Sequence, residues 1–499
     1  MVGRNHRLIV VSNRLPFVFH RGETGQWCAE PGAGGLVSAL LPVLRHCGGT
    51  WIGWPGTDRL GDGLEQALAE AGSAAGYALC PVYLSTEEVH DFYHGFANEV
   101  IWPLFHDLQS LCNFEPRYWR SYREVNRKFA QAVQDNSSEE DFIWVHDYHL
   151  MHLAHELRAL GSTSRIGFFL HTPFPPLDIF NKLPWCKPLI LALLNFDLLG
   201  FQTPRDRRNF VQCVRALARD VQIDGKRQIV TATLGAREVR IGAFPISIDF
   251  NAMLRQAATP EVAAKARELH RLLPERRLVL GIDRLDYTKG IPHRLKAFHN
   301  LLTRYPQLRE KITLIQVVVP SRVGIHNYDE LKTSIEQLVG RINGEFAQPG
   351  AWVPVWYVYG CLQRDDLLAY YRAADIALVT PLKDGMNLVA KEYCASSIEE
   401  DCVLILSEFA GAAAQLQRGA LLVNPYDTEG VADALLHACE MDMVERRGRM
   451  RRMRRSIREY DIFWWLDAFL RAAFSKDLSD FPQLDSYNAE MAHSYLPIE

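Results

Sequence analysis

Short runs of apolar, largely β-branched residues recur along the chain and alternate with stretches of helical periodicity. The runs are continuous rather than alternating, which predicts strands that are covered on both faces, as in a parallel sheet. Amphipathic stretches such as 328–342 and 366–373 suit the crossover helices of such a sheet. The predicted strands are Leu8–Val11, Phe142–Val145, Ile166–Leu170, Leu198–Phe201, Leu278–Ile282, Thr313–Val318, Val353–Tyr359, Ile376–Val379, Val403–Leu406 and Ala420–Val423.

The order strand, helix, strand, helix occurs twice, with a seam near 243–246. A chain of 499 residues also exceeds what one hydrophobic core usually supports. We therefore predict an α/β protein with two doubly wound, Rossmann-like domains, over 1–245 and 246–455. The aromatic helix expected in 456–475 should pack back on the first domain, and 476–499 should form a loosely held tail.

Composition and charge exclude several classes of protein. With 48% hydrophobic and 23% charged residues, the chain has the composition of a globular protein rather than a disordered one. Its formal net charge of -4 provides no overall field that would attract nucleic acid or anionic lipid. We expect the arginine-rich run over 445–458 to be a solvated helix face, because Met450 and Met453 interrupt it at helical spacing, and a nucleic-acid patch is the less favoured alternative. Neither a nucleic-acid nor a membrane partner is predicted.

The ten cysteines are scattered singly, without a Cys-x-x-Cys motif and without a cluster that includes histidines. This pattern indicates neither a disulfide framework nor a cysteine-based zinc site, and it favours a reducing cytoplasm. The apolar run at Leu8–Val11 is too short for a signal sequence, and no stretch approaches the roughly 20 apolar residues that span a bilayer. We expect a cytoplasmic protein in which nearly all of the cysteines are buried apolar filler.

Two cations follow the strand predicted over 278–282, just before a helix. Arg284 and Lys289 would lie at the carboxyl end of that strand and near a helix N-terminus, which together make an anion site. We expect a diphosphate leaving group there, held by arginine as a fork and by lysine as a point charge. An ion pair with Asp283 or Asp286 is the structural alternative.

A second cluster, 381–392, follows the strand predicted over 376–379. Gly385 would let the backbone approach a ligand closely, and the next amides are expected to open a helix and to face an anion. Glu392 lies about two turns along if the helix starts at Gly385, and its carboxylate can bind ribose hydroxyls. An N-cap role for Asp384 is the structural alternative.

The first half of the chain carries weaker signals. A glycine loop at 31–36 precedes an expected helix over 37–44, and polar residues including His146 and His171 follow two predicted strands. The chain contains no Asp-x-Asp motif, which argues against a diphosphate held by a divalent metal. We therefore expect no metal and no other cofactor.

Seven unbroken motifs occur in a fixed order: Ser12-Asn13-Arg14-Leu15-Pro16, Gly34-Gly35-Leu36, Tyr93-His94-Gly95-Phe96-Ala97-Asn98, Trp102-Pro103, Val145-His146-Asp147-Tyr148-His149-Leu150, Asp283-Arg284-Leu285-Asp286-Tyr287 and Asp384-Gly385-Met386-Asn387-Leu388-Val389. Together they resemble the retaining trehalose-6-phosphate synthase family, glycosyltransferase family 20, over roughly residues 7 to 470. The resemblance implies the GT-B fold, in which two Rossmann-like domains face each other across a cleft. It also implies retention at the anomeric carbon and no metal requirement.

The resemblance also implies a role for individual residues. Binding of the nucleotide-sugar donor would involve Gly35, Arg284, Lys289, Asp384, Gly385, Met386, Asn387, Leu388, Val389 and Glu392. Binding of the phosphorylated acceptor would involve Arg14, Trp54, Tyr93, Trp102, Asp147 and Arg322. The residues expected to act in catalysis are Arg284, Lys289, His171 and Asp384.

The function implied is transfer of glucose from a nucleotide diphosphate glucose, with UDP-glucose expected, to glucose 6-phosphate, giving α,α-trehalose 6-phosphate. The segment 358–363 lacks the polar or basic residues common beside the base in the family, so GDP and ADP stay open alternatives. The run 323–325 replaces a frequent acidic residue, so a sister synthase with another acceptor, such as glycerol 3-phosphate, also stays open. A non-catalytic sugar-phosphate sensor is a third alternative. The expected partners are small-molecule substrates, and homo-oligomerisation is left open.

Overall fold

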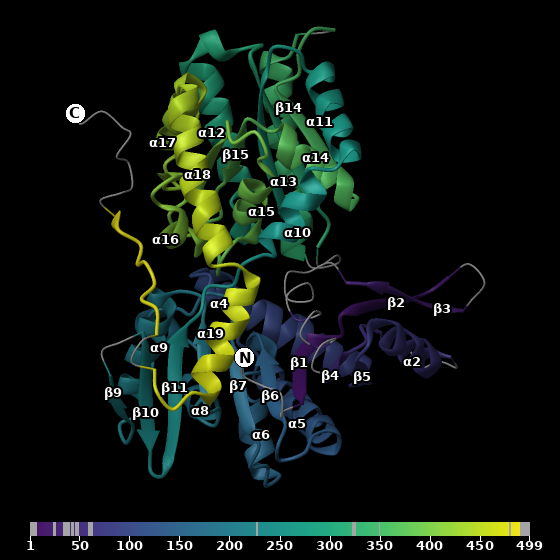
Figure 1. The fold of residues 1–499 in the computed structure, drawn as a ribbon, viewed down its shortest axis with the longest axis vertical. Helices are drawn as coiled ribbons and strands as arrows, with labels where there is room; N and C mark the ends of the chain where they lie inside the picture. The colour runs from purple at the N-terminus through teal and green to yellow at the C-terminus, as the bar shows by residue number, and fades with distance from the viewer. Residues whose placement is uncertain are drawn as a thin grey trace. The chain divides into compact units, whose positions relative to one another are not determined.

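The computed structural model describes residues 7–22, 26–32, 40, 44, 49–57, 63–225, 228–321, 326–348, 350–478 and 481–489. Contacts within the chain divide it into two units (Figure 1). Unit 1 comprises 1–246 with 463–484, and unit 2 comprises 247–462 with 485–499. All ten strands predicted from the hydrophobic runs are present.

Unit 1 is built on a sheet with the strand order β5-β4-β1-β6-β7-β8-β11-β10-β9. Its strands are β1 (Leu8–Arg14), β4 (Gly49–Trp54), β5 (Ala78–Pro81), β6 (Phe142–His146), β7 (Arg165–Phe169), β8 (Leu198–Phe201), β9 (Gln222–Asp224), β10 (Ile229–Leu234) and β11 (Arg237–Ala243). Neighbouring strands from β5 to β11 pair in parallel, whereas β10 pairs antiparallel with both β9 and β11. A separate antiparallel hairpin is formed by β2 (Phe17–Arg21) and β3 (Trp27–Pro31).

The helices of unit 1 connect and cover these strands. They are α2 (Leu64–Ala75), α3 (Thr86–Glu88), the π-helix η1 (Val89–Ile101), α4 (Trp102–Phe105), the 3-10 helix η2 (Gln109–Leu111), α5 (Pro116–Asn136), the 3-10 helix η3 (Tyr148–Leu150), α6 (Leu153–Ala159), α7 (Leu177–Phe180), α8 (Cys186–Leu193), α9 (Pro204–Leu217) and α19 (Ile462–Phe474). No helix in the described part of the chain combines the length and apolarity that a membrane span requires.

Unit 2 has a wholly parallel sheet with the order β14-β13-β12-β15-β16-β17. Its strands are β12 (Arg277–Arg284), β13 (Ile312–Val319), β14 (Val355–Tyr359), β15 (Ile376–Val379), β16 (Val403–Ser407) and β17 (Leu421–Val423). Its helices are α10 (Phe250–Ala257), α11 (Pro260–Leu272), the 3-10 helix η4 (Tyr287–Lys289), α12 (Ile291–Arg304), the 3-10 helix η5 (Pro306–Leu308), α13 (His326–Phe346), α14 (Arg364–Ala373), α15 (Leu388–Ser396), α16 (Ala412–Leu416), α17 (Thr428–Glu440) and α18 (Met443–Glu459).

The strand order identifies both sheets as Rossmann-like. Six strands of each sheet, taken in order along the chain, follow the spatial order 3-2-1-4-5-6 of dinucleotide-binding folds. In that order the chain turns to opposite sides of the first strand, and the point of reversal lies between β1 and β6 in unit 1 and between β12 and β15 in unit 2. Ligands of such sheets bind outside the carboxyl ends of the strands at this point.

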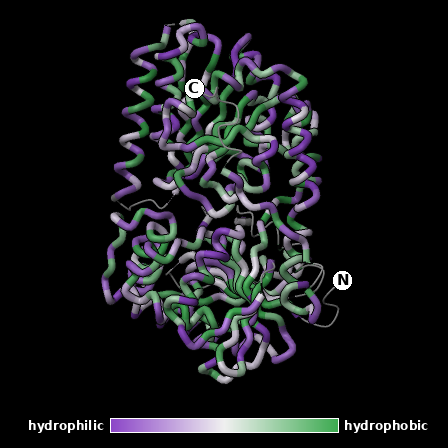
Figure 2. The backbone as a smooth tube through the Cα atoms, turned by 90° about the vertical axis from the view of Figure 1, so that its left-hand side faces the viewer, coloured by the Kyte–Doolittle hydropathy of each residue, from purple (hydrophilic) through white to green (hydrophobic). Residues whose placement is uncertain are grey.

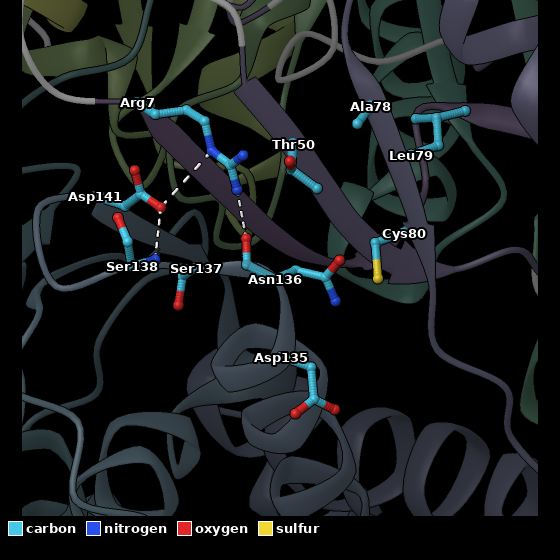
Figure 3. Close-up of a pocket in the computed structure, with 10 residues that line it drawn as sticks. All are labelled: Arg7, Thr50, Ala78, Leu79, Cys80, Asp135, Asn136, Ser137, Ser138 and Asp141. Carbon is cyan, nitrogen blue, oxygen red and sulfur yellow. Dashed lines mark hydrogen bonds and ion pairs between the residues drawn. The ribbon is translucent and has the colours of Figure 1, made fainter.

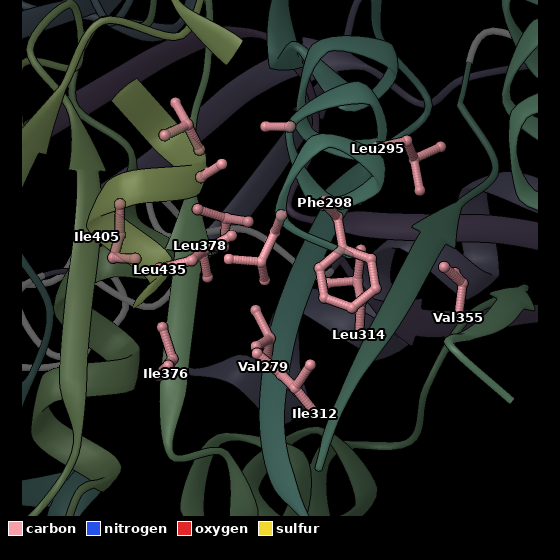
Figure 4. Packing of buried hydrophobic residues seen from close by; sticks show 14 of the residues in the cluster. Val279, Leu295, Phe298, Ile312, Leu314, Val355, Ile376, Leu378, Ile405 and Leu435 are labelled. Carbon is pink, nitrogen blue, oxygen red and sulfur yellow. The ribbon is translucent and has the colours of Figure 1, made fainter. Parts of the chain in front are cut away.

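The core of unit 2 explains why its strands read as unbroken apolar runs. Val279 of β12 packs in a cluster with Phe298 of α12 and Leu435 of α17 (Figure 4). Leu278, the preceding residue, packs in a different cluster with Ala266 of α11 and residues near α14. Successive residues of one strand therefore bury their side chains on opposite faces of the sheet. Within each unit, hydrophobic segments are frequent in the interior of the tube, and hydrophilic segments are frequent along its outer helical turns (Figure 2).

Helix α19 follows unit 2 in the sequence but packs on unit 1. Trp465 is fully buried and stacks on Trp144 of β6, with ring centroids 5.1 Å apart. Phe469 lies flat against the same indole at 4.3 Å. The tail beyond α19 is not loosely held over its described part, contrary to the prediction. Phe481 packs edge-on to Phe244, and the amide N–H of Asn488 donates to Gln417 Oε1 at 2.9 Å.

The arginine-rich helix α18 is only partly a solvated face. Arg446 and Arg454 are each 7% exposed, and both cap other helices. Arg454 donates to the carbonyls of Cys394, Ala395 and Ser397 at the C-terminus of α15. Periodicity alone could not separate these two arginines from their exposed neighbours, because each finds its acceptors on another helix.

Candidate active site

In unit 2 the two predicted donor clusters follow neighbouring strands at the reversal point of the sheet. Arg284 ends β12 and Asp384 lies just beyond β15, and these two strands are hydrogen-bonded to each other. The Nζ atom of Lys289 lies 2.5 Å from Asp384 Oδ2, and both side chains are largely buried. Asn387 Nδ2 donates to the same carboxylate oxygen at 3.1 Å. The structure therefore brings Lys289, Asp384 and Asn387 into one polar cluster.

Backbone contacts fix the two loops of this cluster against each other. The amide N–H of Leu382 donates to the carbonyl of Thr288 at 2.7 Å. Gly290 has a φ of +66°, and a Cβ added there would lie 2.4 Å from the carbonyl oxygen of Thr380. Only glycine combines this conformation with so close an approach. The loops after β12 and β15 are thus held together by their main chains as well as by the Lys289–Asp384 ion pair.

The ion pairs alternatively considered for Arg284 and Lys289 are not found. Asp283 instead pairs with the buried guanidinium of Arg294 at 2.7 Å, and Asp286 accepts from the amide and the hydroxyl of Thr288. Arg284 is exposed, and its guanidinium makes no hydrogen bond or ion pair with any residue that the structure describes. A cation held at a sheet edge without a protein counter-charge is suited to bind an anionic ligand.

The helix of the second cluster begins later than predicted. Helix α15 starts at Leu388, and Asn387, not Asp384, is its N-cap, with its side chain accepting from the amide of Ala390 at 3.2 Å. Gly385 and Met386 therefore precede the helix. Glu392 lies in its second turn rather than two turns beyond the start, and the hydroxyl of Tyr371 donates to Glu392 Oε2 at 2.9 Å. Burial raises the pKa of Glu392, and the hydrogen bond from Tyr371 opposes that rise.

In unit 1 the predicted acceptor residues also gather at the reversal point of the sheet. Arg14 ends β1, and its guanidinium lies 4.0 Å from the ring centroid of Trp54 and 5.5 Å from that of Tyr93. Trp54 and Tyr93 are in edge contact, with centroids 5.7 Å apart. Burial lowers the pKa of Arg14, although the guanidinium stays charged at any ordinary pH. The three side chains form one wall with a positive charge at its centre.

The rest of the predicted acceptor set connects to this wall through aromatic contacts. Tyr93 belongs to the π-helix η1 and stacks on His149, with centroids 5.9 Å apart. Trp102 packs against Tyr148 at 5.8 Å, and the Tyr148 hydroxyl donates to Asn98 Oδ1 at 3.2 Å. π-Helical segments are rare and occur mainly at functional sites. Within η1, Asn98 Nδ2 donates to the carbonyl of Tyr93 at 2.7 Å, which links the two residues through the helix.

Asp147 and His171 follow the neighbouring strands β6 and β7. The amide of His171 donates to Asp147 Oδ1 at 3.2 Å, and His146 Nδ1 lies 3.2 Å from His171 Nε2. Asp147 has a φ of 72°, a conformation that costs a non-glycine residue about 1–3 kcal/mol and that is concentrated at functional sites. Asn387, after the corresponding strand of unit 2, has the same φ of 72°.

The two histidines predict a loss of stability in acid. Burial lowers the pKa of His171 to about 3, and burial together with the neighbouring His171 lowers the pKa of His146. Below a pH of about 6.5 these histidines bind protons in the unfolded chain but not in the folded chain. Each histidine therefore lowers the free energy of unfolding by up to about 1.4 kcal/mol for each unit by which the pH falls. Urea unfolding between pH 7.5 and 5 should show this slope, and it should be smaller in His171→Asn. An equal slope in that variant would show that His171 titrates normally.

Two predicted site residues, Gly35 and Arg322, lie outside the described residues, as does most of the glycine loop with its expected helix over 37–44. His146 and His149 were not among the predicted site residues. Both lie in the run that supplied Asp147, and the signal that could have identified His146 is a histidine as the last residue of an otherwise apolar strand.

A cavity of about 650 Å³ lies at the opposite edge of the unit 1 sheet (Figure 3). It is lined by residues at the amino ends of strands, including Arg7, Thr50 and Ala78, and by Asn136 at the end of α5. At one side of it, Arg7 Nε lies 3.7 Å from Asp141 Oδ2. None of the predicted site residues lines this cavity, so it is separate from the cluster around Arg14 and Asp147.

Comparisons with known proteins agree with this arrangement. The family model of glycosyltransferase family 20 matches residues 6–474. A trehalose-6-phosphate synthase of Mycobacterium tuberculosis is 42% identical over 93% of this chain and 94% of its own length. A synthase of Burkholderia xenovorans solved with glucose 6-phosphate matches with a TM-score of 0.83 and 36% identity, over 94% of this chain and 99% of the other. An Escherichia coli structure bound with UDP-2-fluoro glucose matches with a TM-score of 0.83 and 37% identity, over 94% and 98%.

These matches confirm the predicted GT-B architecture of two Rossmann-like domains. They extend over nearly the whole chain, and the family match includes both reversal points and every motif that suggested the resemblance. The chain belongs to glycosyltransferase family 20.

Proposed function

We propose that this chain is a retaining glucosyltransferase that joins glucose from UDP-glucose to glucose 6-phosphate, releasing UDP and α,α-trehalose 6-phosphate. The observation that carries the proposal is the pair of polar clusters, one at the reversal point of each Rossmann-like sheet. One offers cations and a carboxylate, and the other offers an arginine in an aromatic wall. Related structures were solved with glucose 6-phosphate and with UDP-2-fluoro glucose, which supports this donor and this acceptor.

On the donor side, Arg284 and Lys289 bind the diphosphate. The exposed guanidinium of Arg284 can form two parallel hydrogen bonds to phosphate oxygens, whereas Lys289, held by Asp384, supplies a fixed point charge. Asp384 accepts hydrogen bonds from glucose hydroxyls, and Glu392, oriented by Tyr371, accepts them from the ribose. The remaining donor contacts come from Gly35 and from the loop that precedes and opens α15, namely Gly385, Met386, Asn387, Leu388 and Val389.

On the acceptor side, Arg14 binds the phosphate of glucose 6-phosphate, with Tyr93 and Arg322. The guanidinium of Arg14 already lies over the Trp54 ring, so binding an anion there costs little further ordering. Trp54 and Trp102 provide flat apolar surfaces for the sugar ring, and Asp147 accepts from its hydroxyls.

The chemistry follows a front-face substitution. The bond between the anomeric carbon of glucose and the diphosphate oxygen breaks while the acceptor hydroxyl forms its new bond on the same face. The departing phosphate oxygen takes the proton of that hydroxyl, so charge and atoms balance without a protein base. His171 is neutral at physiological pH because burial lowers its pKa to about 3, so it contacts the sugar as a hydrogen-bonding group and not as an acid. Catalysis rests on positioning and on stabilisation of the leaving diphosphate.

The direct test is a product assay with the purified protein. UDP-glucose, GDP-glucose and ADP-glucose are each offered with glucose 6-phosphate, glycerol 3-phosphate or a cyclitol phosphate, and nucleoside diphosphate release and product linkage are measured. The expected result is the highest kcat/KM with UDP-glucose and glucose 6-phosphate, an α,α-linked product and unchanged turnover in EDTA. A higher kcat/KM with another pair would reassign the substrates, and no release with any pair would indicate a sensor.

A glycine behind the donor loop provides a structural test. A Cβ at Gly411 would lie 1.9 Å from the carbonyl oxygen of Gly385, and the Gly411 amide donates to the Asp384 carbonyl at 3.1 Å. Because the clash is with main chain, Gly411→Ala must displace the loop, and overpacking of this kind costs about 1–3 kcal/mol. We expect UDP affinity, measured by calorimetry, to fall about tenfold or more. Gly344→Ala in α13, where a Cβ meets nothing within 4 Å, is the matched control. Unchanged UDP affinity in Gly411→Ala would place the nucleotide elsewhere.

A further inference from the structure

One turn of helix α6 in unit 1 carries three side chains that can bind a transition metal. His152 is the N-cap residue of α6 and already has right-handed helical dihedrals, and His155 and Glu156 follow three and four positions later. Residues at this spacing share one face of a helix. The potential ligand atoms of His152, His155 and Glu156 all lie within 4.8 Å of one another.

The geometry of the group approaches that of a bound ion. Zinc binds imidazole nitrogen and carboxylate oxygen at about 2.0–2.2 Å, which puts two tetrahedral ligands about 3.4 Å apart. His152 Nδ1 and Glu156 Oε1 are 3.1 Å apart, and the two imidazole rings have centroids 4.8 Å apart. The exposed side chain of His155 is able to change rotamer and bring its ring nitrogen closer to the other two ligand atoms.

Burial distinguishes this group from a chance surface cluster. The side chain of His152 is 5% exposed and that of Glu156 is 14% exposed, so two of the ligands are held in the wall of the domain. The edge of the Trp119 ring from α5 packs at 84° to the His152 ring with centroids 5.6 Å apart. A buried imidazole with a fixed orientation loses little freedom when it binds an ion, and the exposed His155 leaves an open path from solvent.

From this geometry we propose that His152, His155 and Glu156 form a zinc site, with water completing the coordination. Two imidazoles and one carboxylate suit Zn²⁺, and also Co²⁺ and Ni²⁺, better than Mg²⁺ or Ca²⁺, which prefer oxygen ligands. None of the three residues has a role in the proposed transfer reaction. The site is therefore compatible with a reaction that needs no metal.

One neighbouring charge opposes a cation here. Arg123 of α5 lies close enough that its charge contributes, after burial and His155, to lowering the pKa of His152. The same charge would weaken binding of a divalent ion. Arg123→Gln should therefore increase Zn²⁺ affinity, whereas the substitution would have no effect on metal binding if the three residues formed no site.

The experiment is calorimetric titration of the full-length, EDTA-treated protein with Zn²⁺ under reducing conditions. We expect one saturable site that His155→Ala loses and that Glu156→Gln weakens about tenfold or more. His155 is exposed, so its removal leaves the fold intact. His270→Ala, at an exposed histidine of α11 in unit 2, should titrate like the wild type.

A spectroscopic readout identifies the ligands independently of affinity. Co²⁺ added to the wild-type protein should give visible absorption bands of an ion with imidazole ligands, and His155→Ala should not give them. The proposal is overturned if wild type binds no Zn²⁺ saturably, or if His155→Ala titrates and absorbs as the wild type does. Because neither readout uses turnover, failure here leaves the proposed transferase function untouched.

Discussion

Arg294→Met is expected to destabilise unit 2 by about 3–5 kcal/mol, because it leaves a buried carboxylate without its partner. Arg294 and Asp283 are paired at 2.7 Å, and their side chains are 0% and 3% exposed. Arg294 also donates to Thr380 Oγ1 and Gln316 Oε1, each at 3.2 Å. Since Asp283 and Thr380 lie at the strand ends that carry the donor loops, the loss should weaken UDP binding as well.

Hydrogen exchange of β12 and β13 in urea measures this effect, because it reports on unit 2 alone. Asp283→Asn/Arg294→Met, which removes both charges, should recover part of the stability. Burial already raises the pKa of Asp283 while Arg294 and Lys289 lower it, so the single variant should regain stability as the pH falls and the carboxyl takes up a proton. Equal stability of wild type and Arg294→Met would show that the pair is solvated.

Arg284→Ala should lower kcat/KM by a hundredfold or more while the fold is retained. Removing one preorganised charge from a developing oxyanion costs about 3 kcal/mol in comparable sites. The guanidinium of Arg284 is exposed and has no hydrogen-bond or ion-pair partner among the described residues, so its loss leaves no buried charge behind. The expected effect is therefore on the reaction and not on stability.

Steady-state kinetics measure the loss of kcat/KM, and an unchanged Tm would show that the substitution affects the reaction and not the stability of the fold. Arg284→Lys keeps a point charge but loses the fork, so it should recover only part of the rate. Arg267→Ala, at an exposed arginine of α11, is the matched control and should behave as the wild type. Near-normal turnover in Arg284→Ala would falsify the assignment of the leaving group to this residue.

The parallel strands could be predicted from sequence because burial on both faces of the sheet requires apolar residues at successive positions, which gives a continuous apolar run. Seven strands outside that pattern, β2, β3, β4, β5, β9, β10 and β11, were not predicted as strands, and all belong to edges, hairpins or glycine-containing segments. Strand β10, which lies between β11 and β9, alternates over its first positions between partly buried and buried residues, as an antiparallel strand with one solvent-facing side does. Strand β4, which ends at Trp54, was not predicted because Gly53 interrupts its apolar run.

In the candidate site, too, features set by neighbouring residues in the sequence could be predicted, whereas contacts between distant residues could not. The positions of Arg284 and Asp384 beyond strands followed from the order of residues along the chain. Their partners did not, because the ion pair of Lys289 joins residues 95 positions apart, and the contact between Gly411 and Gly385 is set by a third strand. Tyr371, which orients Glu392, comes from a neighbouring helix. Local sequence gives no signal for such partners.

The packing of Trp465 and Phe469 on Trp144 has a consequence for biosynthesis. Unit 1 receives its last helix from residues 463–484, so more than 200 residues of unit 2 leave the ribosome before that helix does. During this interval the indole of Trp144 lacks its cover, and the nascent first domain exposes an apolar surface to which chaperones bind. A ribosome stalled near residue 460 should therefore hold a first domain that is far more sensitive to protease than the same domain in the released chain.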